Sequence, residues 1–204
     1  MLKPMEHFAP PTGQHPGPSR IDAVVSGELS WTEVDLVDLA GGETEALRSV
    51  LETYGVRVNR FPVGQPRHLV AALGGVRQAA PYVVLSCHGA DGGILLDELI
   101  PEVARNQPFL GSAGPDEIRA HLRFPGSVVI STGCDTGTRA LADAVFDAGG
   151  SAYLAPESEP FGHAAVFAVL YLFYELTEGR TLEQAVATLR EHDAELAKWR
   201  LFLP

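Results

Sequence analysis

The sequence predicts an α/β fold, a three-layer sandwich with a mostly parallel central sheet. Strand-like and helix-like segments alternate from about residue 21 onward, the pattern of a sheet covered by helices. Residues 82–86 and 127–131 are continuous β-rich runs without polar alternation, as expected of strands buried on both faces. The length of 204 residues suits one such domain, and apolar residues at 46% provide for a sizeable core.

The first half of the pattern contains two short strands and two helices before the first long apolar run. Residues 34–39 and 56–61 are short and mostly apolar, which predicts strands. Between them, apolar residues recur with helical spacing, and Gly55 ends that helix in the left-handed conformation. Pro66 opens a second helix, which runs to residue 73.

The second half continues the alternation and closes with two helices. Thr181 and Gln184 form a capping box at the start of the last helix. After the strand at 82–86, the sequence predicts a hairpin arm, a helix, the strand at 127–131, a helix, a last strand and two helices: residues 94–96, 115–122, 127–131, 140–148, 151–155, 163–176 and 182–196.

Composition and charge exclude several classes of protein. Lys and Arg number 15 against 26 Asp and Glu, a net charge of −11, so no basic surface is predicted for nucleic acid or for an anionic membrane. No apolar run reaches the roughly 18 residues of a membrane span, and the N-terminus has no signal-peptide pattern. Two cysteines provide no disulfide framework, so we expect a cytoplasmic, reduced location.

Two parts of the chain are expected to behave differently. Residues 1–20 are rich in proline and polar residues and lack periodicity, which predicts a flexible leader. Residues 21–204 are predicted to form the single folded domain.

Two reactive side chains follow the two buried strands. His88 comes after the run at 82–86, and Cys134 after the run at 127–131. Parallel neighbouring strands end at one edge of a sheet, where sites of such folds lie. A single cysteine or histidine is most often structural, but a pair placed in this way favours a nucleophile and its base. We therefore expect a Cys134 thiol with a lowered pKa.

The residues around this pair fit acyl transfer. The backbone N–H groups of Gly89 and Cys134 are candidate donors to the oxyanion. Cys87 precedes His88 on the strand and should face the core if His88 faces the cleft. A Cys87–Cys134 disulfide is not expected without a secretion signal, and the spacing of His and Cys residues does not predict a metal site.

The sequence around both residues resembles the caspase-like cysteine peptidases, in particular their bacterial CHAT-type branch. Ser-Thr-Gly-Cys-Asp-Thr-Gly at 131–137 is similar to the nucleophile motif, and Ser-Cys-His-Gly at 86–89 to the histidine motif. Residues 173–185 resemble the closing helices. The resemblance implies a Rossmann-like caspase sandwich, His88 as base, Cys134 as nucleophile, and Gly89 and Cys134 N–H as the oxyanion hole. Residues 155–160 depart from the family's Trp-Pro-Val-Asp-like segment.

The predicted function is therefore a cysteine endopeptidase that cleaves a specific protein or peptide through a thioacyl-enzyme, without cofactor or metal. The alternatives are a catalytically silent CHAT-like module that binds peptides, and a thiol acyltransferase or peptide cyclase. Many relatives carry partner domains, so we expect any regulator to be a separate protein. Acidic residues near the site predict a basic residue at the cut. The candidates are Asp91, Asp97, Asp135, Glu157 and Glu159.

Overall fold

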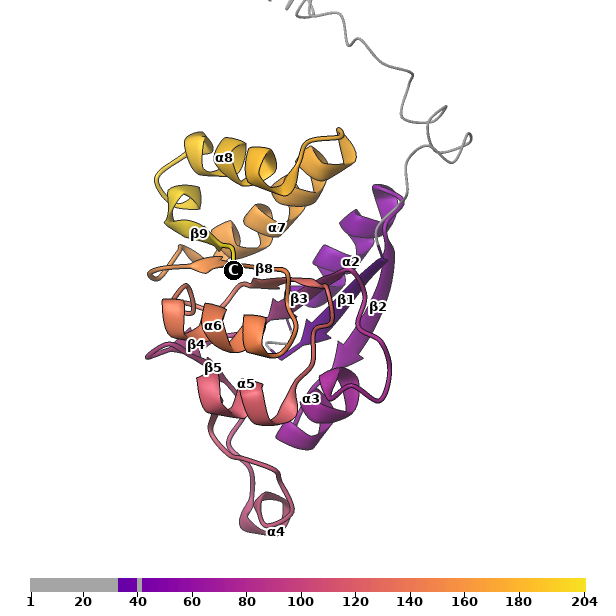
Figure 1. Cartoon of the computed structure of the whole chain (residues 1–204), viewed down its shortest axis with the longest axis vertical. Coiled ribbons are helices and arrows are strands. Elements are labelled where there is room, and N and C mark those ends of the chain that lie inside the picture. Colours follow the sequence, from indigo (N-terminus) through magenta and orange to yellow (C-terminus); the bar gives the residue numbers. More distant parts are fainter. Residues whose placement is uncertain (1–32, 40–41) are drawn as a thin grey trace, which may run out of the picture. The chain divides into compact units, whose positions relative to one another are not determined.

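The computed structural model describes residues 33–39 and 42–204, so the predicted leader at 1–20 lies outside the described residues. Its centre is a six-stranded sheet in the order β2-β1-β3-β7-β8-β9 (Figure 1). The first five strands are parallel, and β9 runs antiparallel to β8. The prediction of a mostly parallel sheet is confirmed. The strands are β1 (Glu33–Asp38), β2 (Arg57–Pro62), β3 (Tyr82–Ser86), β7 (Val128–Ser131), β8 (Ala152–Pro156) and β9 (Trp199–Phe202).

One face of the sheet is covered by α2 (Thr44–Thr53), α7 (Gly162–Thr177) and α8 (Leu182–His192). Val84 of β3, Ile130 of β7 and Leu154 of β8 point toward this face and pack into one buried cluster with these helices. Helices α7 and α8 lie side by side (Figure 1). The α7 residues that enter this cluster, among them Val169, Leu172 and Phe173, are buried, whereas Phe167 and Tyr174 of the same helix are exposed.

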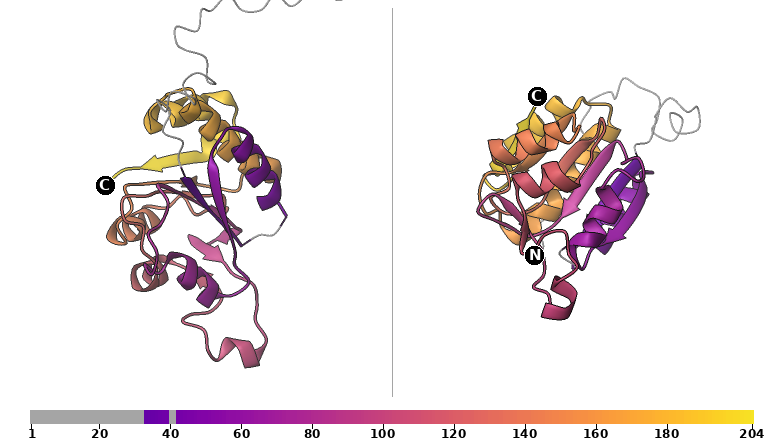
Figure 2. Two further views of the ribbon diagram at one scale, coloured as in Figure 1. Left: turned by 90° about the vertical axis from the view of Figure 1, so that its right-hand side faces the viewer. Right: turned by 60° about the horizontal axis from the view of Figure 1, so that its bottom comes forward.

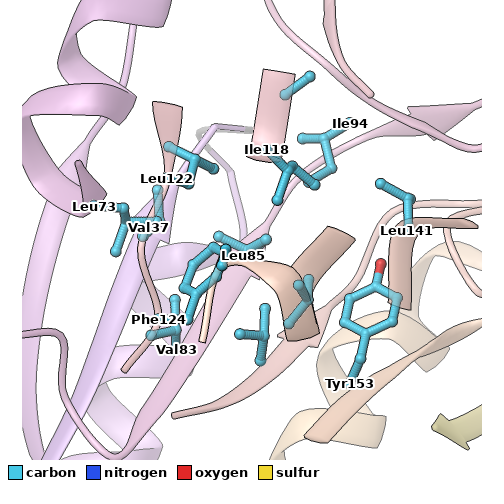
Figure 3. Packing of buried hydrophobic residues seen from close by; sticks show 14 of the residues in the cluster. Val37, Leu73, Val83, Leu85, Ile94, Ile118, Leu122, Phe124, Leu141 and Tyr153 are labelled. Atoms are coloured by element: carbon cyan, nitrogen blue, oxygen red, sulfur yellow. The ribbon is translucent and has the colours of Figure 1, made fainter. Parts of the chain in front are cut away.

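The opposite face is covered by α3 (Pro66–Leu73), α5 (Pro115–His121) and α6 (Arg139–Asp147). Figure 2 shows two further views of these layers. Figure 3 shows Val83 and Leu85 of β3 beside Phe124, which is fully buried. Alternate residues of each strand thus enter opposite clusters, and the predicted three-layer sandwich is confirmed.

A second, three-stranded sheet follows β3. It consists of β4 (Gly89–Ala90), β5 (Gly93–Leu95) and β6 (Ser112–Ala113), all antiparallel. Asp91 and Gly92 form the β4–β5 turn with φ of 51° and 70°, the geometry that Asp-Gly favours in tight hairpins. The hairpin arm expected at 94–96 is confirmed as β5. Short helix α4 (Pro101–Ala104) and strands β4 and β6 were not predicted.

The C-terminal end differs from the sequence prediction. The helix expected at 182–196 ends at His192, because Asp193 is extended and its side chain accepts hydrogen bonds from the N–H groups of Glu195 and Leu196. A 3-10 turn, η1 (Leu196–Lys198), and the edge strand β9 follow, so the strand at 151–155 is not the last. Four residues of β9 are too few for a readable alternation, although Trp199 is fully buried. The capping box of Thr181 and Gln184 is confirmed.

The helices of the described residues are all too short or too polar to span a lipid bilayer.

Candidate active site

His88 and Cys134 lie at the same edge of the central sheet. Strands β3 and β7 are neighbours with Leu85 opposite Ser131, so the residues that follow them leave the sheet side by side. Both His88 and Cys134 line one pocket of about 250 Å³. The structure therefore brings together the two residues that the sequence pairs, because parallel strands end at a common edge.

Residues from two other parts of the chain, 42–43 and 160–165, also line this pocket. His88 also lines a second pocket of about 330 Å³, so its exposed side chain lies between two hollows. The first pocket is lined in addition by Gly42, Glu43, Cys87, Thr132, Pro160, Gly162 and Ala165. The second is lined in addition by Asp38, Leu39, Pro62, Val63, Gly64 and Asp97.

The three candidate side chains differ in exposure. His88 is exposed, Cys134 is partly exposed, and Cys87 is 5% exposed within the core cluster. This difference follows from the alternation of side chains along an extended segment. The Cys87 sulfur lies 3.5 Å from the Ser131 hydroxyl, and burial raises the pKa of the Cys87 thiol. Both cysteines are free, and Cys87 is expected to be the less reactive thiol because its sulfur is buried.

Glycines let the two loops approach each other at backbone distance. A Cβ placed on Gly89 would lie 2.3 Å from the Cys134 carbonyl oxygen. A Cβ on Gly133 would lie 3.1 Å from the Gly89 nitrogen. Asp135 takes a positive φ of 56°, which turns the chain sharply after the cysteine. Any side chain at position 89 would thus push apart the loops that carry His88 and Cys134.

The Gly89 N–H is directed away from its own sheet. The Leu95 N–H donates to the His88 carbonyl, which makes this pair a hydrogen-bonded pair of the antiparallel ladder. The next pair, Gly89 with Ile94, is therefore a non-hydrogen-bonded pair. In such a pair the N–H groups point outward, and for Gly89 at the edge this is the side of the Gly133–Cys134 loop.

The electrostatics of Cys134 differ from the sequence expectation. Burial, Glu159 and Asp135 raise the pKa of the Cys134 thiol above its ordinary value. The backbone N–H of Cys134 and the Lys198 ammonium lower that pKa, with a smaller effect. The expectation of a lowered pKa is therefore wrong for the free protein, because two carboxylates lie near a partly buried sulfur.

The acidic residues suggested for substrate binding lie mostly outside the two pockets. Asp91 is exposed in the β4–β5 turn, and Glu157 forms an ion pair with Arg200. The lining described above contains neither of them, nor Asp135 or Glu159, although the last two act on the Cys134 pKa.

The acidic residue that does line the first pocket is Glu43, which sequence reasoning missed. Glu43 directly precedes α2, and α2 follows β1, a strand that ends at the same edge of the sheet as β3. To predict this placement from the sequence, one would have to know that β1 lies beside β3. Local sequence patterns do not give the order of strands in a sheet, because that order is set by tertiary contacts. Asp97 lines the second pocket together with Asp38, which is hydrogen-bonded to Arg60 and Thr44.

The loop that follows β8 forms one wall of the first pocket through Pro160. The C-terminal segment holds this loop at three points. The Glu157 N–H donates to the Lys198 carbonyl at 2.9 Å, and Lys198 Nζ donates to the Glu159 carbonyl at 2.8 Å. The Phe161 N–H donates to Glu195 Oε2 at 2.7 Å. The same contacts bring the Lys198 ammonium near Cys134.

Neither pocket carries the ligand set of a metal site. Residues 33–39 and 42–204 contain no group of three His, Cys, Asp or Glu side chains that could bind an ion.

The architecture is similar to that of two solved peptidase structures. The Arg-specific cysteine proteinase gingipain R superposes with a TM-score of 0.53 at 14% identity, over 90% of this chain and 50% of that chain. The separase of the Saccharomyces cerevisiae separase–securin complex superposes with a TM-score of 0.50 at 10% identity, over 85% of this chain and 12% of that chain.

The fold resembles that of the caspase-like cysteine peptidases. The chain spans about half the length of the gingipain chain and a much smaller part of the separase chain. No protein-family model matches the sequence, and no curated protein matches it.

Proposed function

We propose that the protein is a cysteine endopeptidase in which His88 and Cys134 form the catalytic dyad. The observation that carries the proposal is that both side chains line one pocket, at the ends of adjacent parallel strands. The similarity of the fold to caspase-like cysteine peptidases adds support. The Gly-Cys-Asp-Thr-Gly segment around Cys134 supports an assignment to the CHAT-type branch.

The chemistry follows from the groups at the pocket. Cys134 Sγ attacks the carbonyl carbon of the scissile bond while His88 takes the thiol proton. The N–H groups of Gly89 and Cys134 stabilise the negative oxygen of the tetrahedral intermediate. His88 then gives its proton to the departing amine, which leaves a thioester on Cys134. A water molecule, deprotonated by His88, hydrolyses that thioester.

The raised pKa of Cys134 bears on the first step. A thiol with a raised pKa is largely protonated at neutral pH, so His88 acts on it as a general base rather than holding a preformed thiolate. Acylation then requires a neutral His88 that accepts the thiol proton and later returns it to the departing amine.

The same observation favours a second candidate, a non-catalytic module that binds a peptide in this pocket. A protonated, partly buried thiol is a weak nucleophile, and the pocket is present in either case. The two candidates differ in whether a peptide is consumed.

The test uses the purified full chain and a positional-scanning peptide library, with the mass of each product measured. New termini from hydrolysis that disappear in Cys134→Ala and His88→Ala support the endopeptidase. Products joined to an added amine, or cyclised, indicate acyl transfer instead. Binding of peptides without any product supports the module. Cleavage that persists in Cys134→Ala contradicts the proposed nucleophile.

We further propose a preference for a basic residue before the cut, determined by Glu43. Its carboxylate lines the pocket of Cys134, and Arg suits a carboxylate through two parallel hydrogen bonds. Glu43→Gln is expected to lower kcat/KM for Arg substrates by about tenfold or more, with a smaller effect on Leu substrates.

Glu45→Gln is the matched control for this preference. Glu45 is exposed on the same helix and pairs with Arg60, and its replacement removes the same charge outside the pocket. Equal effects of the two substitutions, or a wild-type preference for Asp or Leu before the cut, would contradict a role for Glu43.

A further inference from the structure

Three hydroxyl groups are buried beneath the loop that carries Cys134. They belong to Ser131 at the end of β7, Thr136 within the loop, and Tyr153 on β8, and each of these residues is at most 1% exposed. A buried hydroxyl must form hydrogen bonds to offset its loss of hydration, so its partners are fixed. All three hydroxyls form hydrogen bonds with groups of the segment 131–136. The chemistry of the His88–Cys134 dyad does not by itself require these bonds.

The hydroxyls of Ser131 and Thr136 close a ring of hydrogen bonds around Gly133. The Gly133 N–H donates to Ser131 Oγ at 3.2 Å, and Thr136 Oγ1 donates to the Gly133 carbonyl at 2.6 Å. The two hydroxyl oxygens are 2.8 Å apart. Because Thr136 has a single hydroxyl proton and uses it on Gly133, the proton between the two side chains comes from Ser131. Each bond of such a ring polarises the next.

The ring sets the direction of the Cys134 N–H. The Gly133 carbonyl and the Cys134 N–H belong to one planar trans peptide, in which the two groups point in opposite directions. Thr136 holds the carbonyl toward the buried side, so the N–H is directed to the other side, where the cysteine sulfur lies. In agreement, this N–H is one of the groups that lower the pKa of the Cys134 thiol.

The other face of Thr136 contacts the second oxyanion donor. A Cβ on Gly89 would lie 2.6 Å from the Thr136 methyl carbon, so this methyl fills the space beside Gly89. The backbone of Thr136 is itself held from β8, because Tyr153 Oη donates to its carbonyl at 3.0 Å. One side chain thus orients the Cys134 peptide through its hydroxyl and packs against Gly89 through its methyl.

We propose that Thr136, through its ring with Ser131, is a positioning residue that aims the Cys134 N–H at the oxyanion. The inference rests on the proposed peptidase function and extends it to a residue that contacts neither the substrate nor the reacting atoms. Its effect should appear where negative charge develops on the carbonyl oxygen and not in reactions of the sulfur that create no such charge.

Two substitutions separate the hydroxyl from the methyl. Thr136→Val keeps the shape and removes the hydroxyl, whereas Thr136→Ser keeps the hydroxyl and removes the methyl. Ser127→Ala is the control, because Ser127 directly precedes β7 and its fully buried hydroxyl donates to the Ala80 carbonyl. Thr136→Val and Ser127→Ala should lose comparable thermal stability, since each variant loses buried hydrogen bonding.

The readouts are peptide hydrolysis, binding of a peptide aldehyde and alkylation by iodoacetamide. When Cys134 Sγ adds to an aldehyde carbon, His88 takes the thiol proton, and the carbonyl oxygen becomes an alkoxide that occupies the oxyanion position. We expect Thr136→Val to lower kcat by roughly 10- to 100-fold with little change in KM, and to weaken aldehyde binding by a similar factor. The alkylation rate should stay within about twofold of wild type, and Thr136→Ser should recover most of kcat.

Each outcome decides the proposal. Wild-type kcat and aldehyde affinity in Thr136→Val would overturn it, and so would an equal loss in Ser127→Ala. A parallel loss of alkylation would mean general disruption of the loop and would also count against it. If Thr136→Val does not fold, Ser131→Ala provides the same readouts from the other member of the ring. A wild-type protein that neither cleaves peptides nor binds aldehydes would instead refute the peptidase function itself.

Discussion

At the scale of single residues, the site depends on backbone groups as much as on side chains. Gly89 and Cys134 are proposed to act through N–H groups, and Gly133 acts through both of its peptide planes. A backbone N–H donor is retained in most substitutions at its own position, provided that the backbone conformation does not change. The requirement for glycine at position 89 is therefore steric.

Replacing Gly89 by alanine should disable the site while the fold remains. The new Cβ would meet the Cys134 carbonyl oxygen at 2.3 Å, and backbone atoms cannot move aside as a flexible side chain can. We expect a loss of kcat of at least about tenfold and of stability by about 1–3 kcal/mol. Kinetics and thermal unfolding measure both effects.

Gly64→Ala is the control for this substitution. A Cβ at Gly64 has no atom within 4 Å, although the residue lines the second pocket. Near-normal kcat in Gly89→Ala would mean that the two loops can separate without harm, which contradicts the proposed alignment of the two donors.

At the scale of elements, the loop after β8 contributes to the electrostatics of Cys134. Its carbonyl at Glu159 is bound to Lys198, which enters from η1 beside the edge strand β9. Glu159 raises the pKa of Cys134 and Lys198 lowers it. The hydrogen bond between Lys198 and the Glu159 carbonyl therefore joins two residues with opposite effects on this pKa. The position of this loop thus affects the fraction of Cys134 present as thiolate.

Replacing Glu159 by glutamine should make Cys134 more reactive. Removing a nearby negative charge favours the thiolate, so the pKa falls and alkylation at neutral pH becomes faster. Lys198→Met should do the opposite, because a nearby cation is lost. The measurement is the rate of iodoacetamide labelling against pH, with peptide mapping to separate Cys134 from the buried Cys87.

Glu157→Gln controls for charge in the same loop. Glu157 pairs with Arg200 and is not among the groups that shift the Cys134 pKa. Identical pH profiles for the Glu159 and Glu157 variants, or labelling of Cys87 before Cys134, would contradict this account of the sulfur's surroundings.

At the scale of the whole described unit, the site rests on a sheet buried on both faces. Phe124, between α5 and β7, is fully buried in the cluster under β3 that also contains Leu85, three residues before His88. The rigidity of the strand ends depends on such packing, since close-packed interiors transmit displacement. A substitution that leaves a cavity in this cluster is therefore expected to affect the site by displacing the strand ends, without direct contact between the substituted residue and the site.

Phe124→Ala should cost about 3–5 kcal/mol of unfolding free energy, because a large cavity replaces a fully buried ring. This is a large fraction of the roughly 5–15 kcal/mol that stabilises a domain, so the variant should unfold at markedly lower temperature or denaturant concentration. Val76→Ala, at a residue 95% exposed, should change stability by less than about 0.5 kcal/mol. Similar unfolding midpoints for both variants would contradict the assigned core.

Local patterns determined much of the architecture. The run at 82–86 matches β3, because a strand buried on both faces is apolar over most of its length. The capping box at Thr181 and the hairpin arm in β5 are equally local, since each depends on residues within a few positions of one another. The pairing of His88 with Cys134 was predicted because the carboxyl ends of neighbouring parallel strands lie at the same edge of a sheet.

What only the tertiary structure decided depends on contacts between distant segments. Strand β9 owes its place to the edge of β8, and Glu43 reaches the pocket because β1 lies beside β3. The raised pKa of Cys134 is also a tertiary effect, because it comes first from burial of the sulfur and then from Glu159, a residue distant in the sequence. The sequence by itself determined the five parallel strands of the central sheet, most helices and the two reactive side chains, through periodicity and local chemistry. The order of the strands, the residues that line the pocket and the pKa of Cys134 depend on tertiary packing, because each requires contacts that a local sequence pattern does not specify.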